Sequence, residues 1–251
     1  MLRVLFGRRW LLATLLVMAA AGVMVRLGFW QLDRLAARQA YNARVEEQRT
    51  QPELMLDADA LNLNLYAMEY RPVVVRGEYV LDESIVLRNQ SREGQLGVEL
   101  FTPLIFEGTD QAILVQRGWI PAEQAAPADW QAFAEPGLVE VEGILRRAET
   151  DFAVGLRPDP TLAPGEDRLD AWNNLDLARI QAQSSVPLLD VYVQRLPYEQ
   201  QSSPPYAQQL VLDLSEGPHL GYAGQWFLFA IVLLAGYPFY VRRQEQAAGV
   251  E

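Results

Sequence analysis

Two long apolar runs, one near each end of the 251-residue chain, limit what this sequence can fold into. The first runs from Trp10 to Trp30 with Arg26 as its only charged residue, and the second runs from Tyr222 to Val241 without a charge. A helix of about 20 apolar residues crosses the hydrocarbon core of a bilayer, and a long arginine side chain near its end can reach the interface. The sequence therefore predicts transmembrane helices over residues 10–30 and 222–241.

Each run has an alternative interpretation. Three arginines precede the first run, as in a cleaved secretory signal peptide, and Ala19-Ala20-Ala21 resembles a cleavage site. The apolar residues continue well beyond these alanines, which favours a spanning helix. The second run could be the core helix of a soluble protein, but its place ten residues from the end of this sequence favours a spanning helix as well.

The arginines orient the two helices. Arg242 and Arg243 follow the second run directly, whereas no basic residue lies between Arg195 and that run. Because lysine and arginine are enriched on the cytoplasmic side, the C-terminus is expected in the cytoplasm, and an even number of helices returns the N-terminus there. The expected order, in a bacterial plasma membrane, is a cytoplasmic segment 1–9, helix 10–30, an extracytoplasmic domain 31–221, helix 222–241 and a cytoplasmic tail 242–251.

Composition excludes several classes of chemistry. The chain has no cysteine and a single histidine, His219, and its 21 basic residues are all arginine. Disulfides, thiolate metal sites, Schiff-base lysines and multi-histidine metal sites within this chain are therefore excluded. Residues 26–221 carry 16 arginines against 30 acidic residues, a net charge of −14, which argues against nucleic acid as a partner.

The segment between the helices has the pattern of a β domain. Residues 31–50 contain neither glycine nor proline and are expected to extend the first helix as a stalk, which Pro52 ends. Apolar and polar residues then alternate in short segments, as they do in half-buried strands. The seven expected strands are Pro72–Val80, Ser84–Arg88, Val98–Phe106, Ala112–Trp119, Leu138–Arg146, Leu189–Leu196 and Gln208–Leu214. The predicted fold class is a membrane α+β protein, with two transmembrane helices flanking one extracytoplasmic, mostly antiparallel β-barrel or sandwich domain.

Local signals refine this prediction. Turns are expected over 89–94 and 107–110, a helix over Leu175–Gln183 with Asn174 as its N-cap, and a loop over Asp151–Asp170. Proline cannot donate to a strand ladder, so Pro103 predicts that its strand lies at an edge or contains a bulge.

Four stretches resemble one known family. The stretch 28–34 reads Gly-Phe-Trp-Gln-Leu-Asp-Arg, and 70–77 reads Tyr-Arg-Pro-Val-Val-Val-Arg-Gly. Gly94-Gln95-Leu96-Gly97 is followed at 115–121 by Val-Gln-Arg-Gly-Trp-Ile-Pro, and Gly217-Pro218-His219-Leu220-Gly221 opens the second helix. In order and placement these stretches are similar to the Surfeit locus one family of cytochrome c oxidase assembly factors.

The resemblance implies a function rather than a catalysed reaction. It implies an assembly factor of the respiratory chain, a chaperone that equips cytochrome c oxidase subunit I with haem, expected to be haem a. Its partners would be subunit I, other oxidase assembly factors and the lipid bilayer. The alternative function is a cofactor-free scaffold that stabilises nascent oxidase subunits. No serine-hydrolase elbow or cluster of acidic residues with metal-site spacing is present in the sequence, so an enzyme is not expected.

His219 is the candidate haem-iron ligand. It aligns with the histidine that the family links to haem, and a neutral imidazole is a common axial ligand. Tyr222 and Trp226 follow at +3 and +7, on the same helix face, and could cover a porphyrin. A local hydrogen-bonding role for His219, and an interfacial aromatic belt for Trp226, remain open alternatives.

The first helix offers three further candidate haem-binding residues. Trp30 lies at a depth matching the start of the second helix and could contact the macrocycle or belong to the aromatic belt. Arg26 and Arg34 could pair with haem propionates, or could contact phospholipid instead.

Overall fold

The computed structural model describes residues 2–148, 158–162, 165, 167–198 and 201–248. It divides into two compact units. A helical unit comprises Met1–Arg44 and Asp213–Glu251, and a β unit comprises Val45–Leu212.

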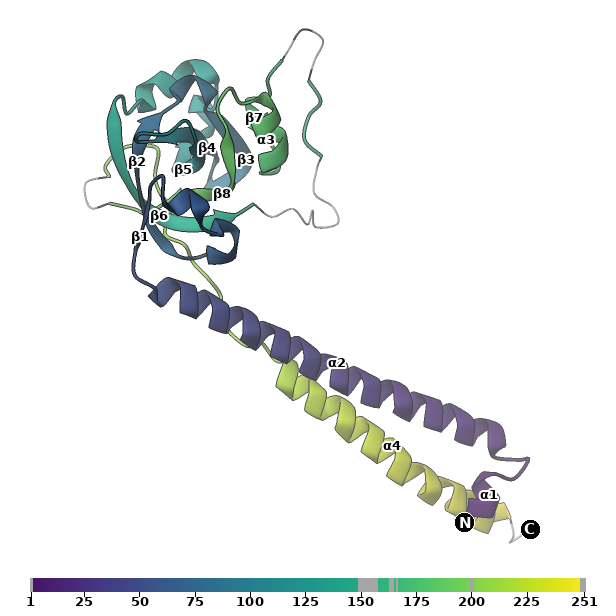
Figure 1. Ribbon diagram of the computed structural model, residues 1–251. Helices are drawn as coiled ribbons and strands as arrows, with labels where there is room; N and C mark the ends of the chain where they lie inside the picture. The colour runs from purple at the N-terminus through teal and green to yellow at the C-terminus, as the bar shows by residue number, and fades with distance from the viewer. Residues whose placement is uncertain (1, 149–157, 163–164, 166, 199–200, 249–251) are drawn as a thin grey trace. The chain divides into compact units, whose positions relative to one another are not determined.

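The helical unit is an antiparallel helix pair (Figure 1). Its elements are α1 (Leu2–Leu5), α2 (Leu11–Thr50) and α4 (His219–Ala248). Thr14 Oγ1 lies 2.9 Å from the Tyr237 hydroxyl, and the rings of Phe29 and Phe227 meet edge to face at 5.4 Å. Because later residues of α2 contact earlier residues of α4, the two helices run in opposite directions. The helix α2 continues without a break through the segment expected as a stalk.

Small residues allow α2 and α4 to approach closely. Thr14, Ala21 and Gly28 recur every seven residues on α2 and are buried, as are Ala223 and Ala230 on α4. A Cβ atom on Gly28 would lie only 2.5 Å from a ring carbon of Phe227, so the phenyl ring packs directly on the glycine. A seven-residue repeat of small residues is typical of tightly packed helices in membranes.

The outward surface of the pair is apolar. The helices α2 and α4 are long and apolar enough to cross a membrane, and few residues of their apolar stretches are buried. A core helix of a soluble protein would bury such residues. The exposed apolar side chains include those of Leu12, Leu15, Leu16, Val23, Leu228, Ile231 and Val232.

The β unit contains a closed barrel. In the described residues the strands are β1 (Leu54–Leu56), β2 (Pro72–Tyr79), β3 (Ile85–Arg92), β4 (Gln95–Phe106), β5 (Ala112–Pro121), β6 (Leu138–Arg147), β7 (Ala171–Trp172) and β8 (Leu188–Arg195). They follow the order β1-β2-β6-β8-β5-β4-β3-β7, and β2 also pairs with β4. That additional pairing closes β2, β6, β8, β5 and β4 into a ring, so the domain is a barrel rather than a sandwich. Most pairs are antiparallel, as predicted, but β1–β2, β3–β7 and β5–β8 are parallel.

One apolar cluster fills the barrel. It takes alternate residues from all five strands of the ring, among them Val73, Val75, Leu104, Phe106, Ile113, Val115, Val141, Leu145, Val191 and Val193. A second cluster covers the outer face of β3, β4, β5 and β8, where the helix α3 (Leu177–Gln183) packs with Leu177 and Ile180. The period-two alternation of these strands therefore divides their side chains between the barrel interior and the α3 layer.

Short 3₁₀ helices connect the strands. They are η1 (Ala60–Asn62), η2 (Leu65–Met68), η3 (Leu81–Glu83), η4 (Ala122–Gln124) and η5 (Pro127–Phe133). Trp130 and Phe133 of η5 are buried against Val86, Val98, Leu100 and Ile120.

The predicted strand over Gln208–Leu214 is wrong. The described residues there are not in a strand, and Val211 is 88% exposed. The only bridge nearby joins Tyr206 to Trp119, just before that segment. Alternating polarity did not produce a strand because no strand edge pairs with these residues.

The hairpin between β3 and β4 is tighter than predicted. The strand β3 continues to Arg92, and the turn shrinks from 89–94 to Glu93-Gly94, both at positive φ. Asn89, at φ +61°, lies where the β3–β4 register shifts between Leu87 and Gln90. The polar residues that suggested a loop therefore form a bulged strand.

Of the two alternatives predicted from Pro103, the edge position is wrong, whereas the bulge has a counterpart in the β4–β5 register, which shifts between Leu100 and Phe101. The strand β4 lies between partners, and Pro103 pairs with Leu114 of β5. On its other side, β4 changes partner: its residues up to Phe101 pair with β3, and its residues from Leu104 onward pair with β2. Pro103 falls at this change of partner, where its missing N–H costs no ladder hydrogen bond.

The helix α3 begins two residues later than predicted. Asp176, rather than Asn174, caps it, because the Asp176 carboxylate accepts a hydrogen bond from the Arg179 N–H at 3.1 Å. The predicted loop over 151–170 lies partly outside the described residues.

Candidate functional site

The one histidine of the chain is the first residue of α4. His219 is partly buried, and its Nδ1 lies 2.8 Å from Oε1 of Gln31 on α2. Gln31 follows the small-residue positions Ala21 and Gly28 on the face of α2 that packs against α4. His219 likewise precedes Ala223 by one turn on the packed face of α4. The close contact of the two helices therefore brings these two polar side chains together.

Glycine lies beside the imidazole. Gly217 has φ +69°, a conformation that favours glycine. A Cβ atom placed on Gly217 would lie 3.5 Å from both the Cδ2 and the Nε2 atom of His219. The Nε2 edge of the ring is therefore next to Gly217, while Nδ1 is engaged by Gln31.

The aromatic residues predicted near His219 occupy two environments. Because α4 is helical from His219 onward, Tyr222 and Trp226 lie about one and two turns along, as expected. Tyr222 is 47% exposed, whereas Trp226 is half-buried and meets the Phe229 ring edge to face at 6.2 Å. Both can offer apolar surface close to the imidazole.

The three α2 candidates form one exposed stripe. Arg26, Trp30 and Arg34 are spaced four residues apart, so they follow one another along a single side of the helix. The guanidinium carbon of Arg34 lies 5.6 Å from the centre of the Trp30 ring, a cation–π contact. The structure thus pairs Arg34 with Trp30 and His219 with Gln31.

These residues fit a haem group in their chemistry. A partly exposed imidazole with one nitrogen held by an outer partner can act as an axial ligand through the other. Tyr222, Trp226 and Trp30 supply apolar aromatic surface, and Arg26 and Arg34 supply exposed cations for propionates. In the described residues, no group of three or more His, Asp or Glu side chains is arranged to hold a metal ion.

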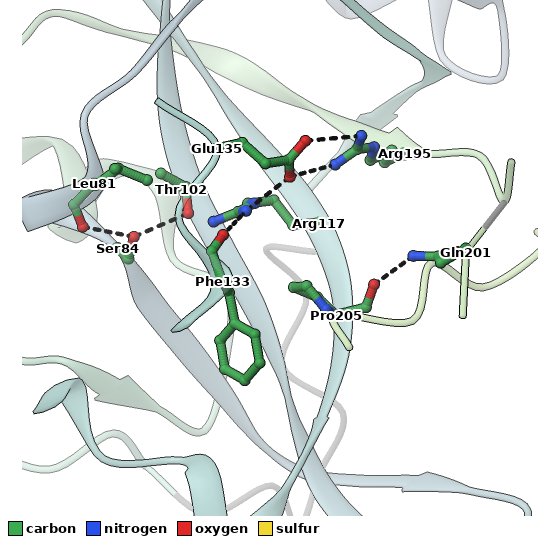
Figure 2. A network of polar contacts seen from close by, with 9 residues as sticks. All are labelled: Leu81, Ser84, Thr102, Arg117, Phe133, Glu135, Arg195, Gln201 and Pro205. Atoms are coloured by element: carbon green, nitrogen blue, oxygen red, sulfur yellow. Dashed lines mark hydrogen bonds and ion pairs between the residues drawn. The ribbon is translucent and has the colours of Figure 1, made fainter. Parts of the chain in front are cut away.

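The β unit holds a buried polar cluster that sequence reasoning missed (Figure 2). Arg117 is 1% exposed, and its Nη2 donates to Glu135 Oε1 at 2.8 Å and to the Phe133 carbonyl. Arg195 donates to both oxygens of Glu135, at 2.7 and 3.1 Å. Burial would raise the pKa of Glu135, but the two arginines, Arg195 foremost, hold it below its usual value.

This cluster lies at the barrel interior. Arg117 continues the inward alternation of Ile113 and Val115, and its guanidinium carbon lies 4.7 Å from the centre of the Tyr79 ring. Burial raises the pKa of Tyr79 to about 12, against the opposing effect of the two arginines. The sequence signal was present, since a charged residue stands where the strand's inward-facing residues are apolar, but the pattern of one strand does not show which acidic residue pairs with Arg117.

A second missed group is Glu99 on β4. It is 3% exposed and accepts a hydrogen bond from Gln208 Nε2 at 2.9 Å. Burial raises the pKa of the Glu99 carboxyl to about 7, although a hydrogen bond with Gln116 opposes the shift. None of the predicted site residues lies in the β unit, so neither buried group belongs to the candidate haem site.

Taken together, the fold and site define a class of protein. Along the chain, a β barrel lies between two membrane-length helices, and a single histidine begins the second helix. The chain belongs to the SURF1 family, which it matches over residues 18–231. The resemblance found in the sequence is therefore confirmed.

Several relatives are similar over different lengths of this chain. A SURF1-like protein of Monosiga brevicollis is 26% identical over 89% of this chain and 85% of its own length. A SURF1-like protein of Rickettsia bellii is 27% identical over 91% of this chain and 90% of its own. The cytochrome oxidase assembly protein SHY1 of Saccharomyces cerevisiae is 30% identical over 49% of this chain, a match that spans 31% of the yeast protein.

Proposed function

We propose that this protein is an assembly factor for cytochrome c oxidase that binds haem at His219 and presents it to subunit I. Membership of the SURF1 family supports the assembly role, as does similarity to a yeast protein named for oxidase assembly. The single observation that carries the haem step is the geometry of His219, whose Nδ1 is held by Gln31 while Nε2 lies on the opposite edge of a partly exposed ring, next to Gly217.

Each predicted site residue has a role in this proposal. His219 Nε2 would be the axial ligand, and Tyr222, Trp226 and Trp30 would contact the porphyrin. Arg34, or Arg26, would pair with a propionate. The haem itself, proposed to be haem a, would later supply the redox chemistry of the oxidase, and this protein would only hold and orient it. The proposal includes no catalysed reaction.

The proposed location follows from charge. Arg242 and Arg243 support a cytoplasmic end of α4 in a bacterial cell, because basic residues are enriched on that side, and both termini would then lie there. The β barrel would then lie outside the plasma membrane. Its acidic composition suits that side, because the anionic cytoplasmic leaflet would repel it.

A cofactor-free scaffold is the second candidate function. The observation that favours it is the same hydrogen bond, because holding α2 and α4 together would be a sufficient role for a half-buried histidine bonded to Gln31. The exposed apolar surface of both helices would then contact nascent oxidase subunits directly.

Substitution of the single histidine separates the two functions. The full chain is expressed in cells that make haem, purified in detergent, and measured for haem per chain and for its optical spectrum. We expect His219→Ala to lose most of the haem while the protein remains folded and membrane-inserted. Substitutions at surface positions usually lower the free energy of unfolding by about 0.5 kcal/mol or less.

The matched control is Gln225→Ala, an exposed polar residue on the same helix. It should retain haem at the wild-type ratio. Haem binding by His219→Ala at wild-type stoichiometry, with an unchanged Soret band, would refute ligation. Haem-free wild-type protein would favour the scaffold.

A further inference from the structure

The contact between Gln31 and His219 joins residues 188 positions apart in the sequence. It is set by helix packing rather than by local structure. One turn before Gln31, Gly28 lies directly beneath the Phe227 ring, which fixes how far one helix can slide along the other. The polar pair is therefore held in register by apolar packing on the same face.

The atoms in contact determine the state of the imidazole. The Gln31 atom facing the ring is its carbonyl oxygen, which can only accept a hydrogen bond. His219 Nδ1 must then carry the proton and donate it. In a neutral imidazole the other nitrogen has no proton, so Nε2 keeps a free lone pair.

We infer that Gln31 is a positioning residue: it fixes His219 in the Nδ1–H tautomer and so leaves the lone pair on Nε2, at the ring edge next to Gly217. The inference about the ligand rests on the proposed haem function, but the inference about the tautomer does not. Metal-binding histidines generally donate their second N–H to an outer partner, which fixes the ring and increases its basicity.

Glutamine at position 31 fixes the tautomer without adding a charge between the helices. A carboxylate at this position would pull harder on the Nδ1 proton, but it would place a negative charge between two apolar helices at a large desolvation cost. A neutral amide fixes the same tautomer without that charge. Gln31→Glu should therefore preserve the tautomer and alter the electronic character of the ligand, whereas Gln31→Leu should lose the preference.

The first experiment reads the tautomer directly. The full chain in detergent is labelled with ¹⁵N-histidine, and because the chain has one histidine, each ring nitrogen gives one signal. Coupling to the ring C–H protons assigns the two nitrogens at a pH where the ring is neutral. We expect Nδ1 to carry the proton in the wild type and in Gln31→Glu, and the two tautomers to mix in Gln31→Leu.

The matched control is Gln39→Leu. Gln39 lies two turns further along α2 and donates to Glu216 at 3.0 Å rather than to the histidine. The substitution Gln39→Leu makes the same change of side chain in the same helix and should leave the histidine signals unchanged. A wild-type signal from Nε2–H would overturn the inference, since the Gln31 amide would then be donating to Nδ1.

The second experiment measures haem. Titration of haem into apo-protein should show a roughly 10- to 100-fold weaker affinity for Gln31→Leu, the usual effect of losing an outer partner. Gln31→Glu should restore tight binding with a shifted Soret band. Wild-type affinity and spectrum in Gln31→Leu would overturn the positioning role even if His219→Ala abolished binding.

The haem function and the positioning role of Gln31 are overturned by different results. If the wild type binds no haem, the proposed function fails, and the NMR result alone supports or overturns the tautomer assignment. If the wild type binds haem through His219 but shows no dependence on Gln31, the proposed function stands and the positioning role is overturned.

Discussion

Replacing Glu99 with glutamine should stabilise the β barrel in alkaline solution and leave it unchanged in acid. Glu99 lies on β4 opposite Leu87 and Trp119 and is 3% exposed. Burial raises the pKa of its carboxyl from the ordinary 4.5 to about 7. The folded protein therefore favours the neutral acid, and ionisation of Glu99 opposes folding.

The pKa shift gives the sign and size of the effect. In the unfolded chain Glu99 ionises near pH 4.5, so below that pH it is neutral in both states and costs nothing. As the pH rises from about 4.5 to about 7, folding requires an increasing penalty, and stability falls. At 1.36 kcal/mol per pKa unit, the full penalty above pH 7 is about 3 kcal/mol.

Glutamine removes that penalty while keeping an oxygen that can accept the hydrogen bond from Gln208. Urea unfolding of the full chain in detergent would be followed by tryptophan emission, because Trp119, Trp130 and Trp172 are buried in the β unit. We expect Glu99→Gln to raise the free energy of unfolding by up to about 3 kcal/mol at pH 8.5 and to match the wild type at pH 4.5, with an unchanged denaturant slope.

Glu142→Gln, an exposed position on β6, is the control and should show no such pH dependence. Equal effects of Glu99→Gln at the two pH values would refute the reasoning. A destabilised variant at pH 8.5 would do so as well, because it would mean that the folded protein stabilises the carboxylate.

Three further outcomes are expected. Glu135→Ala should destabilise the barrel by about 2 kcal/mol in urea unfolding at pH 7. This is less than the roughly 3–5 kcal/mol of breaking a fully buried pair, because Glu135 is partly exposed, although Arg117 is left buried without it. Glu140→Ala, on an exposed pair, is the comparison, and equal losses would contradict the argument. Because the pKa of Glu135 is lowered, its contribution should be present at neutral pH and lost in acid. Protease added to intact spheroplasts should digest the domain and spare tags at both termini, and protection of the domain would reverse the proposed topology. The segment 45–212, expressed alone, should fold without metal and give a β-type circular dichroism spectrum, and a helical spectrum would contradict this.

The parts of the fold that were predicted correctly depend on local periodicity. The apolar runs became α2 and α4, and the alternation over Pro72–Val80 and Leu138–Arg146 became β2 and β6. Their patterns are visible within a single segment. The segment Gln208–Leu214 has a similar pattern but no pairing edge, and a sequence pattern does not say whether an edge will be available.

The site was only partly predictable for the same reason. His219, Tyr222 and Trp226 could be grouped because they share one helix. The bond from His219 to Gln31 depends on the register of two helices distant in sequence, which is set by packing contacts such as that of Gly28 with Phe227. The ion pairs around Glu135 likewise join three separate segments of the chain.

The position of β8 in the barrel has a consequence for biosynthesis. It is the last strand in the described chain, yet it inserts between β6 and β5 rather than at an edge. Until residues 188–195 have been synthesised, β6 and β5 each present an open row of backbone hydrogen-bonding groups, which invites association with other chains. Synthesis of nearly the whole domain must therefore precede its folding. A chain that stops before Leu188 would keep most of the apolar core residues and still have no closed barrel to contain them.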